Sequence, residues 1–531
     1  DGIGPDIDAQ DVTSSLFANW DPFVDPEGSP VLYEWSIGTA AGLADVLGWT
    51  RVGGATRAST STSEVDLPLD RRVFVNVRGY DVAGNRSGIS SSDGIVLGVP
   101  RAPMEYGAPA PDGNTPPTAV IGDSHRIAVE RSGTTWTFRE PVVAGRFVGG
   151  DWWVVGPVEI VGITPRCRSE AGRTLHGSML NPKPAARQGY DSAMFGPDAG
   201  AGFDPELNVG SGISAERPLR VEPGSSLVSA ISSPNAGALP QLEACAVLTV
   251  LAEPPPADAF RPPYCGDDKT CRWRAGALDL SRLARLEPEE GAPDARDLAA
   301  RFARPWLDHV PGWHGRYLHP REHMPDYGRD IADLVGTAAL VLNLRIPDEQ
   351  KRDLAIGLVQ LGIDSYGIVQ AGGRFVADGG SGAGRKFPVV FAGAVLQDDA
   401  LLRCAAESRF AFAEDAQTFY VASTAPGVVN GGHGGYDERD IGLAEWGQCH
   451  RDAPQYDRKP WSADAYRRCC TANAWNGFVL AARILGLQAA WGHDALFDYV
   501  DRYMRIEPHG EWTRSWSPFA ERMWDRNRAR Y

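Results

Sequence analysis

The sequence predicts a multidomain protein in which two β-rich domains precede a helical C-terminal domain. Its 531 residues are too many for a single hydrophobic core. The two-residue alternation typical of strands occurs in the first half of the chain, whereas from about residue 275 apolar residues recur at the helical period. Proline-rich stretches at 101–117 and 254–256 separate these parts. We therefore expect domains at 1–100, 118–252 and 270–531.

The first domain is predicted to be a β-sandwich. Residues 73–80 alternate apolar and polar side chains, as a half-buried strand does, and are followed by a turn signal. Residues 16–20 and 31–38 are two further expected strands, because they are rich in aromatic and β-branched side chains and are bounded by proline and glycine.

Part of this domain resembles a fibronectin type III module. The resemblance lies in the early Trp20, the pair Tyr33 and Trp35 on one strand, and the Val-Arg-Gly-Tyr-Asp-x-Ala-Gly-Asn stretch at 77–85. It covers about a fifth of the chain. The resemblance implies a spacing or docking role in an extracellular enzyme rather than chemistry.

The second domain is predicted from apolar strands at 134–138, 152–160 and 244–251. We interpret it as a second β-sandwich-like domain. Polar loops interrupt it, and they contain His176 and Asn181. If the loops of this domain reach the active-site cleft, these two side chains are the ones expected to bind substrate there.

The third domain is predicted to be all-α. Apolar residues recur at the helical period through 331–342, 354–361 and 478–485, and each apolar helix is followed by a glycine-rich loop and another helix. This repetition indicates an α/α-toroid or part of one. A solenoid is not favoured, because no fixed sequence period is present.

Three glycine-rich loops of the third domain, at 323–329, 379–386 and 431–436, contain most of the candidate chemistry. Loops carry function more often than helix faces do, and we expect these three to meet in one cleft. His433 is framed by four glycines, which is hard to explain by packing, and Tyr436 follows three residues later. These two residues are the first candidates for proton transfer.

Histidine, tyrosine and arginine together are the groups that β-elimination of a uronic acid requires. The reaction removes a proton next to a carboxylate, so a cation or an amide must neutralise that carboxylate while a base takes the proton and an acid assists the leaving oxygen. The candidate catalytic residues are His433, Tyr436, Tyr327, His323, Arg439, Glu445 and His450. The candidate substrate-binding residues are Arg329, Arg385, Lys386 and the two sugar-stacking residues Trp446 and Trp461.

The helical pattern and these residue types make the third domain similar to the α/α-toroid polysaccharide lyases. The similarity rests on the scaffold and on residue type, not on a motif matched position by position. It implies a secreted enzyme that cleaves an acidic polysaccharide. In those lyases the β-sandwich usually follows the helices, whereas here the β-rich domains come first.

Two alternatives stay open. A β-domain followed by an α/α-toroid is also a layout of inverting glycoside hydrolases, which need two carboxylates roughly 6.5–9.5 Å apart. The acidic candidates are Glu414, Asp415, Asp437, Glu438, Asp440 and Glu445. A surface protein that binds a glycan without cleaving it would use the same aromatic loops.

The charge, hydropathy and cysteine content limit the kinds of partner and compartment that we expect. The formal net charge of −16 argues against nucleic acid as the main partner. The sequence has no run of about 18 consecutive apolar residues, so no membrane span is expected. Among the eight cysteines, Cys265 and Cys271 are close enough in sequence to close a small disulfide loop, and disulfides would favour a secreted or cell-surface protein.

No catalytic metal is expected. Four histidines at positions 309, 314, 319 and 323 follow Asp308 closely, but the HExxH pattern is absent. No cofactor is expected either, apart from a structural Ca²⁺ that an Asp- and Gly-rich turn would hold.

Overall fold

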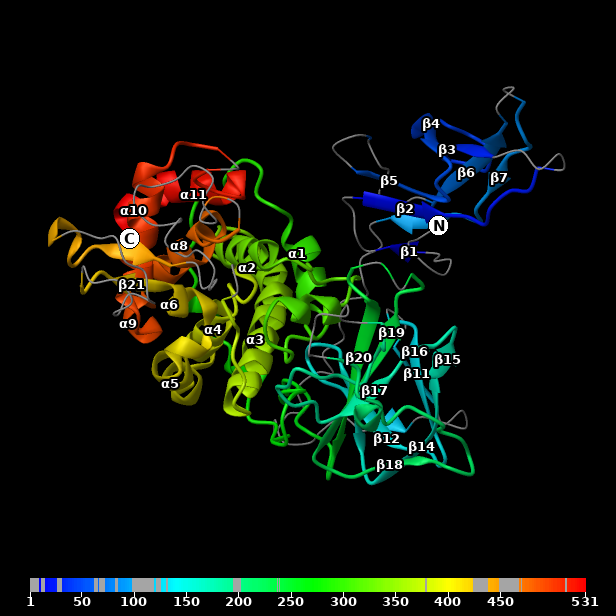
Figure 1. Ribbon diagram of the computed structural model, residues 1–531, viewed down its shortest axis with the longest axis horizontal. Coiled ribbons are helices and arrows are strands. Elements are labelled where there is room, and N and C mark those ends of the chain that lie inside the picture. The colour runs from blue at the N-terminus through cyan, green and yellow to red at the C-terminus, as the bar shows by residue number, and fades with distance from the viewer. Residues whose placement is uncertain are drawn as a thin grey trace. The chain divides into compact units, whose positions relative to one another are not determined.

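The structure is a computed structural model and divides into two compact units, residues 1–105 and 106–531 (Figure 1). The described residues are 9–10, 15–25, 31–61, 65, 72–81, 85–97, 119–120, 126–129, 132–193, 202–235, 237, 239–377, 380–423, 438–447, 468, 470–510 and 513–531.

The first unit is built from short β-strands. β3 (Leu32–Gly38) pairs antiparallel with β4 (Leu47–Gly53) on one side and with β6 (Arg72–Tyr80) on the other, and β2 (Ser15–Asn19) pairs with β5 (Arg57–Ser61). The remaining strands are β1 (Ala9–Gln10), β7 (Ser90–Ser91) and β8 (Ile95–Leu97).

The alternation of buried and outward-facing side chains explains why these segments form strands. In β6, Val73, Val75 and Val77 are buried and pack against Trp35 and Ile37 of β3, whereas the residues between them face away from this core. The strands expected at 16–20, 31–38 and 73–80 are confirmed.

The second unit begins with β-sheets. A six-stranded sheet has the order β17-β19-β20-β13-β12-β9, and a four-stranded sheet has the order β10-β11-β14-β18. Their bounds are β9 (Ala119–Val120), β10 (Arg126–Val129), β11 (Thr134–Phe138), β12 (Val143–Arg146), β13 (Trp152–Val155), β14 (Val158–Thr164), β17 (Ser178–Leu180), β18 (Leu219–Val221), β19 (Ser225–Ser232) and β20 (Leu242–Leu251), with a separate hairpin of β15 (Arg168–Glu170) and β16 (Arg173–Leu175).

The single strand expected at 152–160 is wrong, because the segment forms two strands, β13 and β14, that belong to different sheets. Pro157 interrupts the run, since proline has no N–H to donate to a strand ladder. Gly156 lies so close to Val250 that a Cβ there would come within 2.3 Å of the valine side chain. The strands expected at 134–138 and 244–251 are confirmed as β11 and part of β20.

Helices follow from residue 295 onwards. Their bounds are α1 (Ala295–Phe302), α2 (Gly328–Leu342), α3 (Asp348–Gln370), α4 (Lys386–Leu396), α5 (Asp399–Glu407), α6 (Ala413–Gln417), α8 (Asn476–Ile484), α9 (Gln488–Trp491), α10 (Asp494–Ile506) and α11 (Pro518–Asn527). Two short strands among them, β21 (Thr418–Tyr420) and β22 (Ala444–Trp446), pair antiparallel. Asp294 and Asp398 cap α1 and α5 by accepting hydrogen bonds from the first helical N–H groups.

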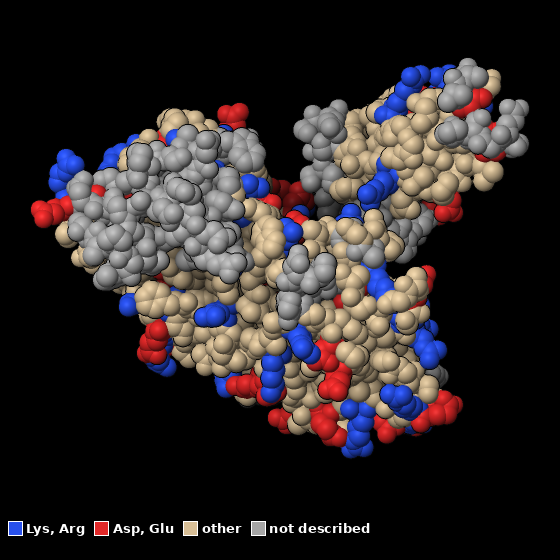
Figure 2. Space-filling view, viewed as in Figure 1, with Lys and Arg blue, Asp and Glu red and all other residues tan. Residues whose placement is uncertain are grey.

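The order of a β-rich part and a helical part is therefore confirmed. The apolar stripes expected at 331–342, 354–361 and 478–485 are buried in α2, α3 and α8. The sheets from residue 119 onwards and the helices belong to the same compact unit. No described helix is both long enough and apolar enough to cross a membrane. On the face in Figure 2, basic and acidic side chains are interspersed.

The expected small disulfide loop between Cys265 and Cys271 is not formed, because both cysteines are free. Lys269 organises the chain between them instead: its buried ammonium donates to the carbonyl oxygens of Pro263, Tyr264 and Gly266 at 2.7, 3.1 and 2.6 Å. Cys470 is disulfide-bonded.

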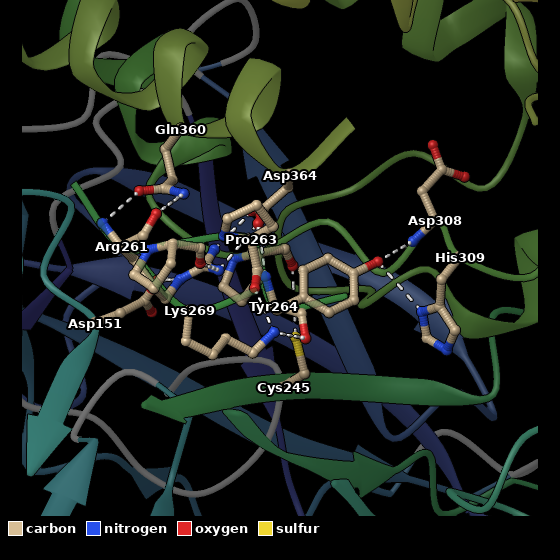
Figure 3. Close-up of polar contacts among 12 residues, drawn as sticks. Asp151, Cys245, Arg261, Pro263, Tyr264, Lys269, Asp308, His309, Gln360 and Asp364 are labelled. Carbon is tan, nitrogen blue, oxygen red and sulfur yellow. Dashed lines mark hydrogen bonds and ion pairs between the residues drawn. The ribbon is translucent and has the colours of Figure 1, made fainter. Parts of the chain in front are cut away.

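A buried ion cluster around Arg261 joins the sheet to the helices (Figure 3). Arg261 is fully buried, and its guanidinium forks onto Asp364 of α3 at 2.9 and 2.6 Å and donates to Asp151, next to β13, at 2.5 Å. Gln360 of α3 pairs its side-chain amide with the backbone N–H and carbonyl of Arg261. A single side chain thus fixes α3 against the start of a central strand.

We expect Arg261→Ala to lower the free energy of unfolding by about 3–5 kcal/mol, because it leaves two carboxylates buried without their cation. The control is Arg285→Ala, which removes an ion pair with Asp348 whose two side chains are 64% and 61% exposed, and should cost less than about 1 kcal/mol. Urea unfolding followed by circular dichroism measures both. Equal losses in the two variants would contradict the assigned role of Arg261.

Candidate functional site

The glycine-rich loop at 380–385 lies against α2 and against Cys470. A Cβ at Gly328, the first residue of α2, would come within 2.0 Å of the carbonyl oxygen of Gly380. Gly384 has a φ of +87°, and a Cβ there would come within 2.7 Å of the Cα of Ala332 in α2. Gly380 in turn lies against Cys470. Two of the three loops expected to converge, 323–329 and the described part of 379–386, therefore do meet.

Arg385, at the end of this loop, forms an ion pair with Asp308, which was not among the candidate catalytic residues. Its Nε and Nη2 donate to Asp308 at 2.5 and 3.1 Å, and its Nη1 donates to the carbonyl oxygens of Ser381 and Ala383. Arg385 is 2% exposed, so this arrangement leaves its guanidinium little to offer a substrate. It fixes the shape of the loop and the position of Asp308.

His319 lies on the other side of Asp308. Its Nδ1 is 2.6 Å from the carbonyl oxygen of Pro325, and because a carbonyl oxygen only accepts, Nδ1 carries the hydrogen of that bond. Its Nε2 is 3.6 Å from Oδ1 of Asp308. Burial alone would raise the pKa of Asp308, but Arg385 and His319 hold that pKa well below its usual range. The carboxylate is therefore ionised next to an imidazole nitrogen that is available for proton transfer.

Asp308, His319 and Arg385 line one polar pocket, together with Arg316, Arg374 and backbone of the glycine-rich loop. The space in the pocket is about 250 Å³ with the open mouth and its solvent included, but the enclosed part is only about 10 Å³, the room that one water molecule needs. The pocket therefore has room for one small polar or charged group, and a sugar ring would lie at its mouth. Three arginines, one histidine and one aspartate make its lining positive, although the whole chain is acidic.

Tyr264 connects the pocket to the buried ion cluster (Figure 3). Its phenol oxygen accepts a hydrogen bond from the backbone N–H of Asp308 at 2.9 Å and lies 3.2 Å from Nδ1 of His309. Burial lowers the pKa of His309 to about 4, so that ring is neutral at pH 7. The backbone N–H of Tyr264 donates to Asp364, so the cluster around Arg261 also positions Asp308.

Tyr327 and Arg329 lie beside the pocket, in a row of aromatic rings and guanidinium groups in contact with one another. Arg316 lies 3.7 Å above the ring of Trp313, and this ring meets Tyr327 edge-on at 5.6 Å. Arg329 lies 4.9 Å from the Tyr327 ring and 3.6 Å from the Trp516 ring. The row brings two of the predicted residues, Tyr327 and Arg329, next to Arg316 of the pocket.

Four other predicted residues are buried away from solvent. Nε2 of His323 is 3.0 Å from the carbonyl oxygen of Pro305. The ammonium of Lys386 contacts Asp415 and donates to the carbonyl oxygen of Trp491 at 2.7 Å. Glu445 forms an ion pair with Arg502. His323, Lys386, Glu445 and Trp446 are at most 3% exposed, and none of them lines the pocket that contains Asp308 and His319.

The remaining predicted residues divide into three groups. Arg439 is exposed on a short 3-10 helix (Glu438–Asp440). His176 and Asn181 both have a positive φ and bond to the backbone of β19, at Ser232 and Ser226, so their polar groups stabilise the sheet. His433, Tyr436, His450 and Trp461, and Asp437 among the acidic candidates, lie outside the described residues.

The sequence patterns missed four residues of the pocket. Arg316 and Arg374 follow the glycine-containing segments Trp-His-Gly and Gly-Gly, a signal that marked other loops as candidates. Asp308 and His319 were noticed only as part of the histidine run. Those histidines do not converge, and among the described residues no group of three or more His, Cys, Asp or Glu side chains could hold a metal ion.

Glu414 and Asp415 of α6 are both fully buried. Burial, followed by the adjacent Asp415, raises the pKa of Glu414 to about 7. One oxygen of Glu414 accepts a hydrogen bond from the backbone N–H of Lys386 at 3.4 Å. The same loop thus ends in Arg385 and Lys386. Arg385 contacts the ionised carboxylate of Asp308, and the backbone of Lys386 contacts Glu414, whose carboxyl pKa is about 7.

Comparison with known proteins adds no relative: no family model matches the chain, and no match was found among curated proteins or solved structures. The function must therefore be argued from the site itself.

Glu414 should make the protein less stable as the pH rises. The pKa of its carboxyl group is about 7 in the folded chain and 4.5 in a model compound, so its favourable contribution is complete below about pH 4.5 and is lost as the pH rises through 7. Glu414→Gln keeps the shape without the charge. We expect this variant to gain about 2–3 kcal/mol over the wild type at pH 8 and little at pH 4.5.

Melting temperatures at pH 4.5, 6 and 8 measure this effect. Glu407→Gln, at an exposed position at the end of α5, is the control and should follow the wild type at every pH. A Glu414→Gln variant whose melting temperature falls with pH as steeply as that of the wild type would contradict the raised pKa.

Proposed function

We propose that this chain is a secreted enzyme that cleaves an acidic polysaccharide by β-elimination. The observation that carries the proposal is the pocket in which Nε2 of His319 lies 3.6 Å from the ionised Asp308, surrounded by an excess of arginine side chains. Elimination on a uronic acid needs these two things together: a group that moves a proton, and positive charge beside it.

The chemistry follows from the hydrogen bonds of His319. Since Nδ1 donates to Pro325, Nε2 of the neutral ring has the lone pair that takes the proton next to the substrate carboxylate. The electrons left by that proton form the new C=C bond, and the glycosidic C–O bond breaks. The resulting imidazolium, stabilised by Asp308, gives the proton to the leaving oxygen. His433 and Tyr436 stay predicted partners in this step.

The scaffold is consistent with this assignment. We infer that the helices after residue 295 form an α/α-toroid and that the sheets before them are β-sandwiches, the first a fibronectin type III-like module. The pocket lies among the loops that precede α2 and α4, where a toroid presents its binding residues. A disulfide at Cys470 supports an extracytoplasmic setting.

The test follows absorbance at about 235 nm and new reducing ends while the protein acts on a panel of uronic-acid and neutral polysaccharides. We expect both signals to rise on a uronic-acid polymer, because elimination yields an unsaturated product. His319→Gln should lower turnover by about 10²–10⁴-fold, because glutamine cannot take the proton. His509→Gln, at a histidine whose side chain is 72% exposed, is the matched control.

Inverting glycoside hydrolysis is the second candidate, favoured by the contrast between Asp308 and Glu414. The pKa of Asp308 lies well below its usual range, whereas that of Glu414 is raised to about 7. Such a difference between two carboxyl groups is typical of a general base, here Asp308, and a general acid, here Glu414. Reducing ends without absorbance at 235 nm, abolished in both Asp308→Asn and Glu414→Gln, would establish hydrolysis and overturn elimination. Binding without either product would leave a glycan-binding protein.

A further inference from the structure

Arg316 and Arg374 of the pocket differ from the neighbouring arginines in whether they form ion pairs. Arg385 is bonded to Asp308, and Arg329 lies next to Asp330 at 3.0 Å. Arg316 stacks on Trp313, and its Nε is buried without a hydrogen-bond acceptor. Within the described part of the chain, neither Arg316 nor Arg374 forms an ion pair.

The two arginines come from separate segments. Arg316 lies on a 3-10 helix (Trp313–Leu318), where the stacking against Trp313 holds its guanidinium plane in place. Arg374 is exposed and follows Gly372 and Gly373 after the end of α3. Both side chains line the pocket that contains His319. Among the described residues that line the pocket, the one carboxylate is Asp308, and Arg385 already neutralises it.

We infer that Arg316 and Arg374 form a carboxylate-binding subsite that holds one uronic acid residue with its acidic carbon next to His319. The inference rests on the proposed function and names the residues that neutralise the substrate. A guanidinium presents two parallel N–H donors that match the two oxygens of a carboxylate. The enclosed space accommodates only a small group, so the carboxylate would point into the pocket while the sugar ring lies at its mouth.

Arg329 and Arg385, which the sequence predicted to bind substrate, are less suited to neutralise its carboxylate. Arg385 already uses its guanidinium for Asp308 and two carbonyl oxygens. Arg329 is stacked on Trp516 and paired with Asp330. Both would have to give up existing contacts before binding a substrate, whereas Arg316 and Arg374 would give up no ion pair.

The experiment measures binding of sodium glucuronate, glucose and sodium sulfate to the full chain by isothermal titration calorimetry, in low and high salt. We expect saturable binding of glucuronate that weakens with added NaCl and no comparable binding of glucose. Arg316→Gln and Arg374→Gln should each weaken glucuronate binding by about tenfold or more. Arg403→Gln, at an exposed position of α5, is the matched control and should bind as the wild type does.

A further variant separates charge from geometry. Arg316→Lys keeps the charge but loses the planar pair of donors and the stacking on Trp313, so it should bind glucuronate more weakly than the wild type and more tightly than Arg316→Gln. Because neither arginine forms an ion pair in the described chain, melting temperatures of all these variants should stay close to that of the wild type.

Three results would overturn the subsite: no saturable glucuronate binding, binding that neither variant changes, or sulfate binding as tight as that of glucuronate. The polymer assay keeps this failure distinct from failure of the proposed function. Elimination products formed with an unchanged KM in Arg316→Gln and Arg374→Gln would retain the lyase and remove the subsite. Glucuronate binding that depends on both arginines, without any unsaturated product, would retain the subsite and remove the lyase.

Discussion

Arg261 is the side chain on which the second unit depends most directly. It is fully buried between the sheet and α3, and it is bonded to one carboxylate from each side, Asp151 and Asp364. A buried cation is tolerated only when its charge is compensated, so the two layers must approach in the one register that brings both carboxylates to it. Asp364 also accepts the backbone N–H of Tyr264, and Tyr264 holds the backbone of Asp308. Asp308 is thus positioned from the interface between the layers.

A second constraint acts from the opposite side of the pocket. The loop at 380–385 passes so close to α2 that glycine is required at 328 and at 384, and this contact sets where Arg385 begins. Arg385 then fixes Asp308 by two hydrogen bonds. Asp308 is therefore held by one segment through its backbone and by another through its carboxylate, which leaves Nε2 of His319 as the lining group best placed to move a proton.

The charge of the pocket and the charge of the chain have opposite signs. The chain carries 68 acidic and 52 basic residues, so a repulsive field would be expected for an anionic polymer. Local geometry reverses this near the pocket, because Asp308 is neutralised by Arg385 while Arg316 and Arg374 have no carboxylate partner in the described chain. Such local fields act over about one Debye length, which is enough to orient a single sugar acid.

The sequence by itself determined the order of β-rich and helical parts, the strands at 16–20, 31–38 and 134–138, and the helices α2, α3 and α8, because these depend on local periodicity. It also predicted that the loops before α2 and α4 meet, and they do at Gly328 and Gly380. It did not distinguish a free arginine from a paired one. Lys386 and Arg385 look alike as exposed cations in a glycine-rich loop, yet Lys386 is buried against Asp415 and Arg385 against Asp308. Only the tertiary structure decided this, because the partner of each charge comes from a residue 29 or 77 positions away, a distance in sequence that no local pattern spans.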